Sequence, residues 1–184
     1  LENFTGMFRY SAITKTIDES DTSILSNITK VKMYKFITPT LNNGTKYTLS
    51  FNNAFFNPHS GHNSAAGGVV SSTGFKISGD DTNEHFLDDD GAGNIRVYYL
   101  SGTTRIYTDS TYGTIDYTNG EIILTSANIT SISNVDGAVS TRVRITTLPS
   151  SNDVIPVRNQ VLSIDTANST ISGGIDEIES GSSQ

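Results

Sequence analysis

At 184 residues the chain is long enough to bury a core, and its formal net charge of −7 argues against a general nucleic-acid binder, which needs a basic face to displace counterions. It has no cysteine, which excludes a disulfide framework, a thiolate zinc site and a cysteine nucleophile, and no apolar run approaches the ~20 residues of a membrane span. Only 17% of the residues are charged, and the abundance of Ser, Thr, Asn and Gly suits antiparallel strands and tight turns better than helices. We therefore expect an α+β chain that is predominantly antiparallel β, with neither nucleic acid nor membrane among its partners.

Residues 1–52 predict a helix followed by two strands. Apolar residues recur at helical spacing at the start of this segment, and acidic residues fall on the other side. The apolar positions are Ile13, Ile17, Ile24 and Ile28. We expect one amphipathic N-terminal helix over residues 10–26. Because its β-branched residues lower its helix propensity, we expect it to pack on a sheet.

The two expected strands lie at residues 30–39 and 47–51. The apolar residues of the first change parity between Met33 and Phe36, which indicates either a β-bulge or a strand that is apolar on both faces. The second strand alternates apolar and polar residues, so one of its faces should be buried. An Asn-Asn-Gly turn signal at 42–44 separates the strands, and we expect them to pair as a hairpin with a long loop.

Residues 53–74 predict a long loop rich in Gly, Asn and Ser, with Phe55 and Phe56 anchoring its base. A structureless loop of more than ~15 residues is uncommon in a compact domain and is often functional or an interface. We expect residues 75–172 to form a β-rich domain and residues 173–184 to be a flexible acidic tail or linker. The non-methionine start and this ending predict a fragment of a longer protein.

Strand patterns follow one another closely between residues 86 and 125 and predict a β-meander of about four strands. Within it, residues 103–125 read as three short strands. Asn119 and Gly120 separate two of them, and a two-residue type I′ turn needs positive φ at both central positions, which Asn and Gly tolerate best. The sequence therefore predicts a β-hairpin at these two residues.

Asp88, Asp89 and Asp90 precede a Gly-rich turn, and oxygen ligands on a turn of this kind are what Ca²⁺ takes. The spacing does not fit an EF-hand, because no Glu follows at the twelfth position and no helix pair flanks the turn. We therefore favour a plain acidic hairpin turn over an ion site.

His59 and His62 lie in a loop with Pro and Gly, and His85 follows further along the chain. Imidazoles can bind a transition metal, but a spacing of three in a loop imposes no required geometry, and no carboxylate lies close in sequence to the pair. We favour capping or loop packing for these histidines. No metal, cofactor or catalytic residue is assigned.

An enzyme is not expected. No serine sits in a Gly-x-Ser-x-Gly nucleophile elbow, and the three histidines are clustered rather than distributed like members of a triad. Tyrosines gather in the meander and could bind a sugar or a partner, although cross-strand packing is the favoured role. They are Tyr98, Tyr99, Tyr107, Tyr112 and Tyr117.

Three stretches carry a family resemblance. They are I-T-P-T-L-N-N-G-T-K-Y-T-L-S-F-N-N-A-F-F-N-P-H-S-G-H at 37–62, R-V-Y-Y-L and Y-G-T-I-D-Y-T-N-G-E-I-I-L within 94–124, and D-V-I-P-V-R-N-Q-V-L-S-I-D at 153–165. Together they resemble the C-terminal part of the large baseplate wedge protein of contractile-tailed phages, of the kind found in marine cyanophages. The helix-then-strand unit at 10–39 is similar to a unit in the wider J-like family of baseplate proteins.

The resemblance implies a structural component of the virion, placed in the tail baseplate and assembled in the host cytoplasm. Members of that family pair with each other and with other wedge proteins, form the ring around the tail hub, and pass the baseplate's change of shape to sheath contraction. The family has no active site to carry over, and the interface residues stay open. The alternative is a carbohydrate- or cell-surface-binding β-module, which Tyr, Asn and Asp in turns would serve.

Overall fold

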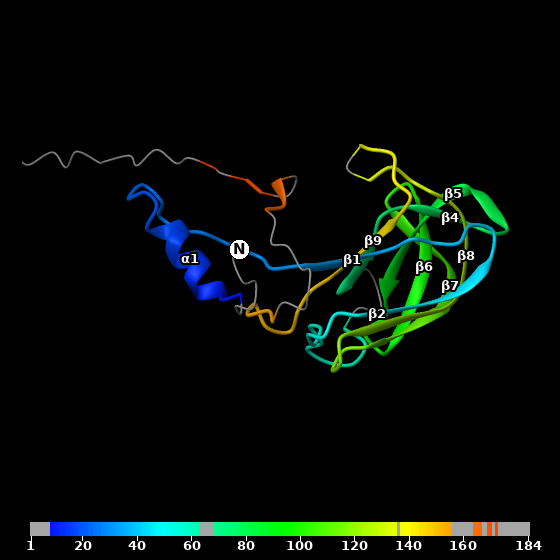
Figure 1. Cartoon of the computed structure of the whole chain (residues 1–184), viewed down its shortest axis with the longest axis horizontal. Coiled ribbons are helices and arrows are strands. Elements are labelled where there is room, and N and C mark those ends of the chain that lie inside the picture. Colours follow the sequence, from blue (N-terminus) through cyan, green and yellow to red (C-terminus); the bar gives the residue numbers. More distant parts are fainter. Residues whose placement is uncertain are drawn as a thin grey trace, which may run out of the picture.

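The computed structural model describes residues 8–62, 68–135 and 137–155, together with the short pieces 164–166, 169–170 and 172. Within these residues the chain forms one helix and nine strands (Figure 1). They are α1 (Tyr10–Asp18), β1 (Met33–Ile37), β2 (Gly44–Ser50), β3 (Val70–Ser72), β4 (Phe75–Ile77), β5 (Asp80–Asp89), β6 (Asn94–Ser101), β7 (Thr104–Asp116), β8 (Glu121–Ile132) and β9 (Val143–Thr147). The expected α+β class with mostly antiparallel strands is confirmed. No helix in the described part of the chain is long and apolar enough to cross a membrane.

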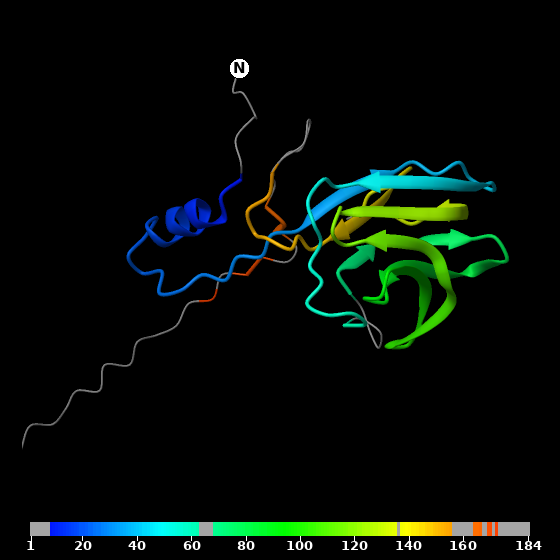
Figure 2. The ribbon, with the colours of Figure 1, turned by 90° about the horizontal axis from the view of Figure 1, so that it is seen from below.

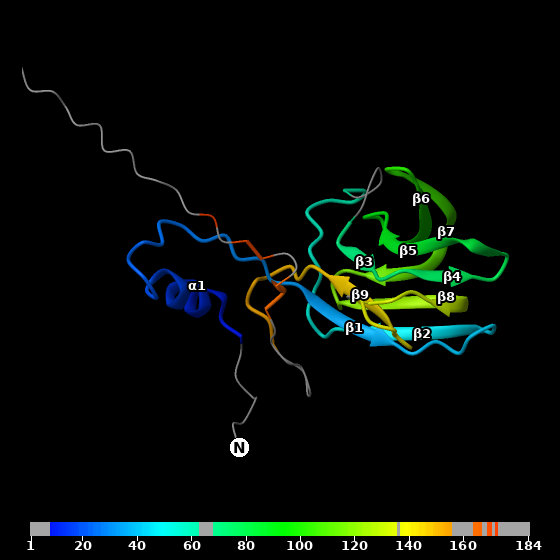
Figure 3. The same ribbon diagram turned by 90° about the horizontal axis from the view of Figure 1, so that it is seen from above.

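Antiparallel pairing builds two sheets. The larger has six strands in the order β2-β8-β4-β5-β6-β7, and β7 also pairs with β8, so strands β4 to β8 form a closed ring of paired strands (Figure 3). Strands β5, β6, β7 and β8 follow one another with antiparallel neighbours, which confirms the predicted meander. The smaller sheet has the order β1-β9-β3.

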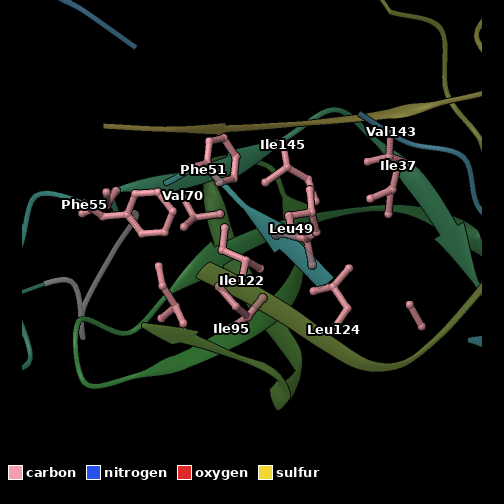
Figure 4. Packing of buried hydrophobic residues seen from close by; sticks show 14 of the residues in the cluster. Ile37, Leu49, Phe51, Phe55, Val70, Ile95, Ile122, Leu124, Val143 and Ile145 are labelled. Atoms are coloured by element: carbon pink, nitrogen blue, oxygen red, sulfur yellow. The ribbon is translucent and has the colours of Figure 1, made fainter. Parts of the chain in front are cut away.

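The core lies between the two sheets (Figure 4). Burial alternates along β9, as it does on an antiparallel strand that faces a core on one side and solvent on the other. Apolar side chains from the inner face of the small sheet meet those of the larger sheet. They include Ile37, Val70, Val143 and Ile145 from the small sheet and Leu49, Phe51, Ile95, Ile122 and Leu124 from, or beside, the larger one.

The hairpin at Asn119-Gly120 is confirmed, but its turn differs from the expected one. Asp116 pairs with Glu121, so the loop has four residues, 117–120. Of the two residues predicted to form the turn, Asn119 and Gly120, only Gly120 has positive φ (65°). The Asp116 carboxylate accepts hydrogen bonds from the backbone amides of Thr118 and Asn119 and from the Asn119 side chain. This Asx-type loop replaces a type I′ turn because a nearby carboxylate satisfies the loop amides. The expectation of three short strands over 103–125 is also wrong, since β7 runs unbroken through 13 residues.

The N-terminal helix is shorter than predicted and does not pack on a sheet. It ends at Asp18, so Ile24 and Ile28 lie beyond it, and none of its residues is buried. The views in Figures 1 and 2 place α1 to one side of the strands. The hydrophobic periodicity overestimated the length of this helix, because residues 20–23 form a turn instead. In that turn the Asp21 carboxylate accepts a hydrogen bond from the Ser23 amide.

The hairpin expected between residues 30–39 and 47–51 is not formed. Strand β1 pairs with β9, whereas β2 pairs with β8, so the two strands belong to different sheets. The register of β1 on β9 is continuous, so β1 has no bulge in this pairing. The parity change in its sequence instead reflects apolar residues on both faces of the strand, which was the other predicted explanation. Local turn signals missed both pairings because the partners lie about a hundred residues away in sequence for β1 and about eighty for β2.

Residues 53–74 were predicted to be a loop without strands, but β3 lies within them. Phe55 anchors the loop as predicted: its side chain is buried, and its amide donates to the Tyr117 carbonyl. The Phe56 side chain is exposed, and this residue holds the loop through its amide, which donates to the Leu148 carbonyl at 3.0 Å. The predicted tail at 173–184 lies outside the described residues, and the boundaries proposed at residues 52, 74 and 172 stay predictions.

Candidate functional site

The aspartate run does not form one acidic turn. Asp88 and Asp89 belong to the end of β5 and are buried, and only Asp90 enters the turn that leads to β6. Successive side chains of a strand point to opposite faces, so Asp88 and Asp89 meet different partners. The expectation of a plain acidic hairpin turn is therefore right only for Asp90.

Asp88 is the centre of a charge cluster on the outer face of β5, β6 and β7. Its Oδ1 accepts from Arg96 Nε at 2.8 Å, and its Oδ2 accepts from Arg105 Nη1 at 2.7 Å and from the Tyr107 hydroxyl at 2.8 Å. The guanidinium of Arg96 lies 4.3 Å from the centre of the Tyr107 ring, and that of Arg105 lies 4.5 Å from the centre of the Tyr98 ring. Paired charges and stacked cations make this cluster a cross-strand clamp.

Asp89 joins β5 to strand β3 and to the 117–120 loop on the inner side. Its Oδ1 accepts from the Val70 amide at 2.9 Å, and its Oδ2 accepts from the Tyr117 hydroxyl at 2.6 Å. Burial, followed by this hydrogen bond to a carboxylate, raises the pKa of Tyr117 far above its usual value. The buried carboxylate therefore holds β3 and the 117–120 loop against β5.

Asp90 organises the turn into β6. Its carboxylate accepts hydrogen bonds from the amides of Ala92 and Asn94 and from the Asn94 side chain. Partial burial acts to raise the pKa of Asp90, but these hydrogen bonds and the neighbouring Arg96 outweigh it and lower the pKa. Gly91 and Gly93 take positive φ there. The oxygens that a Ca²⁺ ion would use are thus bound by donors of the chain, and the described residues contain no group of three or more His, Cys, Asp or Glu that could hold a metal ion.

The three histidines occupy two environments. The rings of His59 and His62 lie 5.9 Å apart, and His62 also contacts the rings of Phe56 and Tyr117, as expected for histidines that pack a loop. His85 is fully buried on β5 and packs against the Tyr99 ring, and its Nε2 lies 3.5 Å from Asp80 Oδ2. Burial lowers the pKa of His85.

The tyrosines of the meander pack within the fold. Tyr98 is buried between Phe86, Tyr107 and the Arg105 guanidinium. Burial raises the pKa of Tyr112 to about 12. Cross-strand packing, the favoured role for these residues, describes the contacts that Tyr98 and Tyr107 make.

An open surface depression of about 460 Å³ lies beside the turn at 91–93. Its lining comes from three segments: Asn57 and Ser60, Gly91 to Gly93, and Ile115 to Thr118. Its carboxylate, Asp116, is bound by amides of the neighbouring hairpin loop. The residues that line the depression therefore do not form the pair of general acid and general base that a catalytic pocket needs.

Two exposed surfaces were not predicted from the sequence. The first is the segment 8–29, which we call the arm; it holds α1 and the return stretch that follows, and its side chains Leu25 and Ile28 are 94% and 89% exposed. The second is the outer face of the small sheet, formed by Tyr34, Phe36, Arg142, Arg144 and Thr146. The parity change along residues 30–39 was its signal, because it placed aromatic residues on the side of β1 away from the core.

Comparison with known proteins returns a family match at the start of the chain. A family model described as baseplate structural protein gp6, C-terminal domain III, matches residues 1–36, which is the region of the arm and the start of β1. No curated protein and no solved structure matches the chain. The family match supports a structural, non-enzymatic role in a phage baseplate, and hence a virion component that contacts other phage structural proteins.

Proposed function

We propose that the chain is a structural component of the baseplate wedge of a contractile phage tail, of the marine type that its sequence resembles. In this role it contributes protein–protein contacts to the ring around the tail hub. Its partners are further copies of itself and other wedge proteins. It is assembled into the baseplate in the host cytoplasm.

The observation that carries the proposal is where the family match falls. Residues 1–36 include the arm, which contacts the rest of the described chain where the Tyr10 amide donates to Asp153 at 2.8 Å and where Phe8 bridges to Val154 and packs against the core. Exposed apolar side chains such as those of Leu25 and Ile28 are typical of a contact surface for other proteins. The matched region therefore includes the exposed arm.

The way the chain uses its polar groups also supports a scaffold. Asp88, Asp89 and Asp90 are bound by donors within the fold, and the Asp89 contacts link β3 and the 117–120 loop to β5. A catalytic site instead keeps titratable groups turned toward a substrate pocket. A β-rich body whose aspartates are bound internally, together with an exposed arm, fits protein assembly.

The experiment is reconstitution with the other tail proteins of the same phage. The purified full chain is mixed with each candidate wedge protein, and binding is measured by sedimentation, with the tail-tube protein as a negative control. We expect stable complexes with wedge proteins and none with the tube protein. A chain that stays monomeric at high concentration and binds none of the wedge proteins would overturn the proposal.

A further inference from the structure

His59 and His62 are the first and last residues of a tight turn. The His59 carbonyl accepts hydrogen bonds from the His62 backbone amide at 3.3 Å and from His62 Nδ1 at 3.0 Å. A hydrogen bond from the fourth residue back to the first is typical of a β-turn, which brings its two end residues together. The two imidazole rings accordingly lie 5.9 Å apart, centre to centre. The spacing of three imposes no geometry by itself, whereas this turn places the histidines side by side.

The hydrogen bonds of the two rings determine which nitrogen of each carries the proton. His59 Nδ1 lies 3.2 Å from the Ser60 carbonyl oxygen, and His62 Nδ1 lies 3.0 Å from that of His59. Because a carbonyl oxygen can only accept, each Nδ1 is the donor, and in a neutral imidazole the lone pair is then on Nε2. Histidines that bind a metal typically donate their other ring N–H to a backbone carbonyl or a carboxylate in this way. Both rings therefore present Nε2 as a ligand atom.

The Nε2 atom of His62 is buried and has no hydrogen-bond partner among the residues that the structure describes. Its neighbours Phe56 and Tyr117 contact it through their rings. A buried polar atom without a partner is rare, and a bound ion is one of its physical explanations. The His59 side chain is exposed, so an ion can reach the pair from solvent. The pair thus combines an unsatisfied ligand atom with an accessible one.

We infer that His59 and His62 bind one divalent transition-metal ion of the Zn²⁺ class through their Nε2 atoms. Imidazole suits Zn²⁺, Ni²⁺ and Cu²⁺, whereas Mg²⁺ and Ca²⁺ take oxygen ligands. Zn–N bonds of about 2.0–2.1 Å allow one ion to reach two rings at this separation, with the exposed His59 ring adjusting to it. Two protein ligands leave the other coordination positions to water, which agrees with the lack of any group of three or more His, Cys, Asp or Glu ligands in the described residues.

The turn is already attached to its surroundings, which favours binding. The Gly61 amide, between the two histidines, donates to the Gly91 carbonyl at 3.0 Å, and the His62 ring contacts Tyr117. Since these contacts hold the turn in place, an ion loses little free energy to ordering its ligands. The bound ion links His59 to the loops around Gly91 and Tyr117 and so stabilises this edge of the fold. This site is independent of the proposed function and goes beyond it.

The test titrates Zn²⁺ into the untagged full chain by calorimetry, in a buffer that does not bind metals, with Mg²⁺ as the negative control ion. The ligand variants are His59→Gln and His62→Phe, the second of which keeps a ring between Phe56 and Tyr117 but has no ligand atom. The matched control is His85→Gln, which removes the third, fully buried histidine. Circular dichroism checks the folding of each variant.

We expect the wild type and His85→Gln to bind one Zn²⁺ ion per chain with the same affinity, and Mg²⁺ to give no binding. Each ligand variant should lose at least about tenfold in Zn²⁺ affinity, since loss of even an outer-shell partner costs about 10–100-fold. Zn²⁺ should also raise the denaturation midpoint of the wild type and leave that of the two ligand variants unchanged. A wild type that binds no Zn²⁺ at millimolar concentration, or ligand variants that bind as tightly as the wild type, would overturn the inference.

Nitrogen NMR of the wild type gives a second readout that needs no substitution. Zn²⁺ should shift the Nε2 resonances of both His59 and His62, leave their Nδ1 atoms protonated, and leave the His85 resonances unchanged. A shift at only one of the two histidines, or at Nδ1 in place of Nε2, would overturn the two-imidazole site.

Discussion

Asp88 and Arg96 lie opposite each other on β5 and β6, and Arg96 Nε donates to Asp88 Oδ1 at 2.8 Å. Both residues are buried. The other carboxylate oxygen accepts from Arg105 and Tyr107 on β7, so one aspartate ties three neighbouring strands together. A buried charge is tolerated only when it is paired, which makes this cluster sensitive to the loss of any one member.

Asp88→Ala should strongly destabilise the fold. The substitution leaves the buried Arg96 guanidinium without its carboxylate, and breaking a buried ion pair in this way costs about 3–5 kcal/mol. The free energy of unfolding in urea measures the loss. Asp109→Ala, at an exposed position on β7, is the matched control and should cost less than about 1 kcal/mol. Equal losses in the two variants would contradict the clamp.

Gly120→Ala should destabilise more than Gly102→Ala. Both glycines have positive φ, 65° and 62°, so each substitution introduces a similar backbone strain of roughly 1–2 kcal/mol. An added Cβ at Gly120 would also collide with the Asn53 carbonyl oxygen, whereas nothing lies within 4 Å at Gly102. We expect an additional loss of about 1–3 kcal/mol at Gly120. Thermal unfolding of the two variants compares them directly, and indistinguishable midpoints would contradict the collision.

Tyr117→Phe should weaken the attachment of the hairpin loop. It removes the hydroxyl that donates to the buried Asp89 carboxylate at 2.6 Å, and a hydrogen bond to a charged group is worth about 1.5–3 kcal/mol. Tyr34→Phe, on the exposed outer face, is the control and should be nearly neutral. Chemical denaturation gives both values. A loss at Tyr117 no larger than at Tyr34 would show that the bond contributes nothing.

Acid should destabilise the fold through His85. Its folded-state pKa lies below the ordinary value of 6.5 because the ring is buried, so its contribution is present above that value. As the pH falls through and below about 6.5, the unfolded chain takes up a proton that the folded chain resists, and stability declines. The free energy of unfolding, measured from about pH 7.5 to about pH 5, should therefore fall less steeply in His85→Gln than in the wild type.

The exposed His59 gives the matching control for this pH dependence. His59→Gln should keep the wild-type slope, because it leaves the buried His85 ring in place. A His85→Gln slope identical to that of the wild type would show that another group carries the acid sensitivity.

Local patterns predicted much of the fold. The alternation at residues 94–101 and the Asn119-Gly120 signal identified strands and a hairpin that the structure contains, because strand period and turn preference depend on neighbouring residues. The turn type was missed because the side chain of Asp116, outside the two-residue signal, satisfies the loop amides. The end of α1 was missed for a similar reason, since a turn at Asp21 competes with helical periodicity.

The sequence by itself determined the class of the protein: mostly antiparallel β, acidic, without cysteine and without a recognisable catalytic motif. Only the tertiary structure decided the roles of the aspartate run, because Asp88 and Asp89 share a stretch of chain but point to opposite sides of β5. It also decided which apolar residues face a core: Ile37 does, whereas Phe36 beside it lies on the outer face. Such choices depend on partners such as β9 that are distant in sequence, and no local propensity encodes a contact between segments a hundred residues apart.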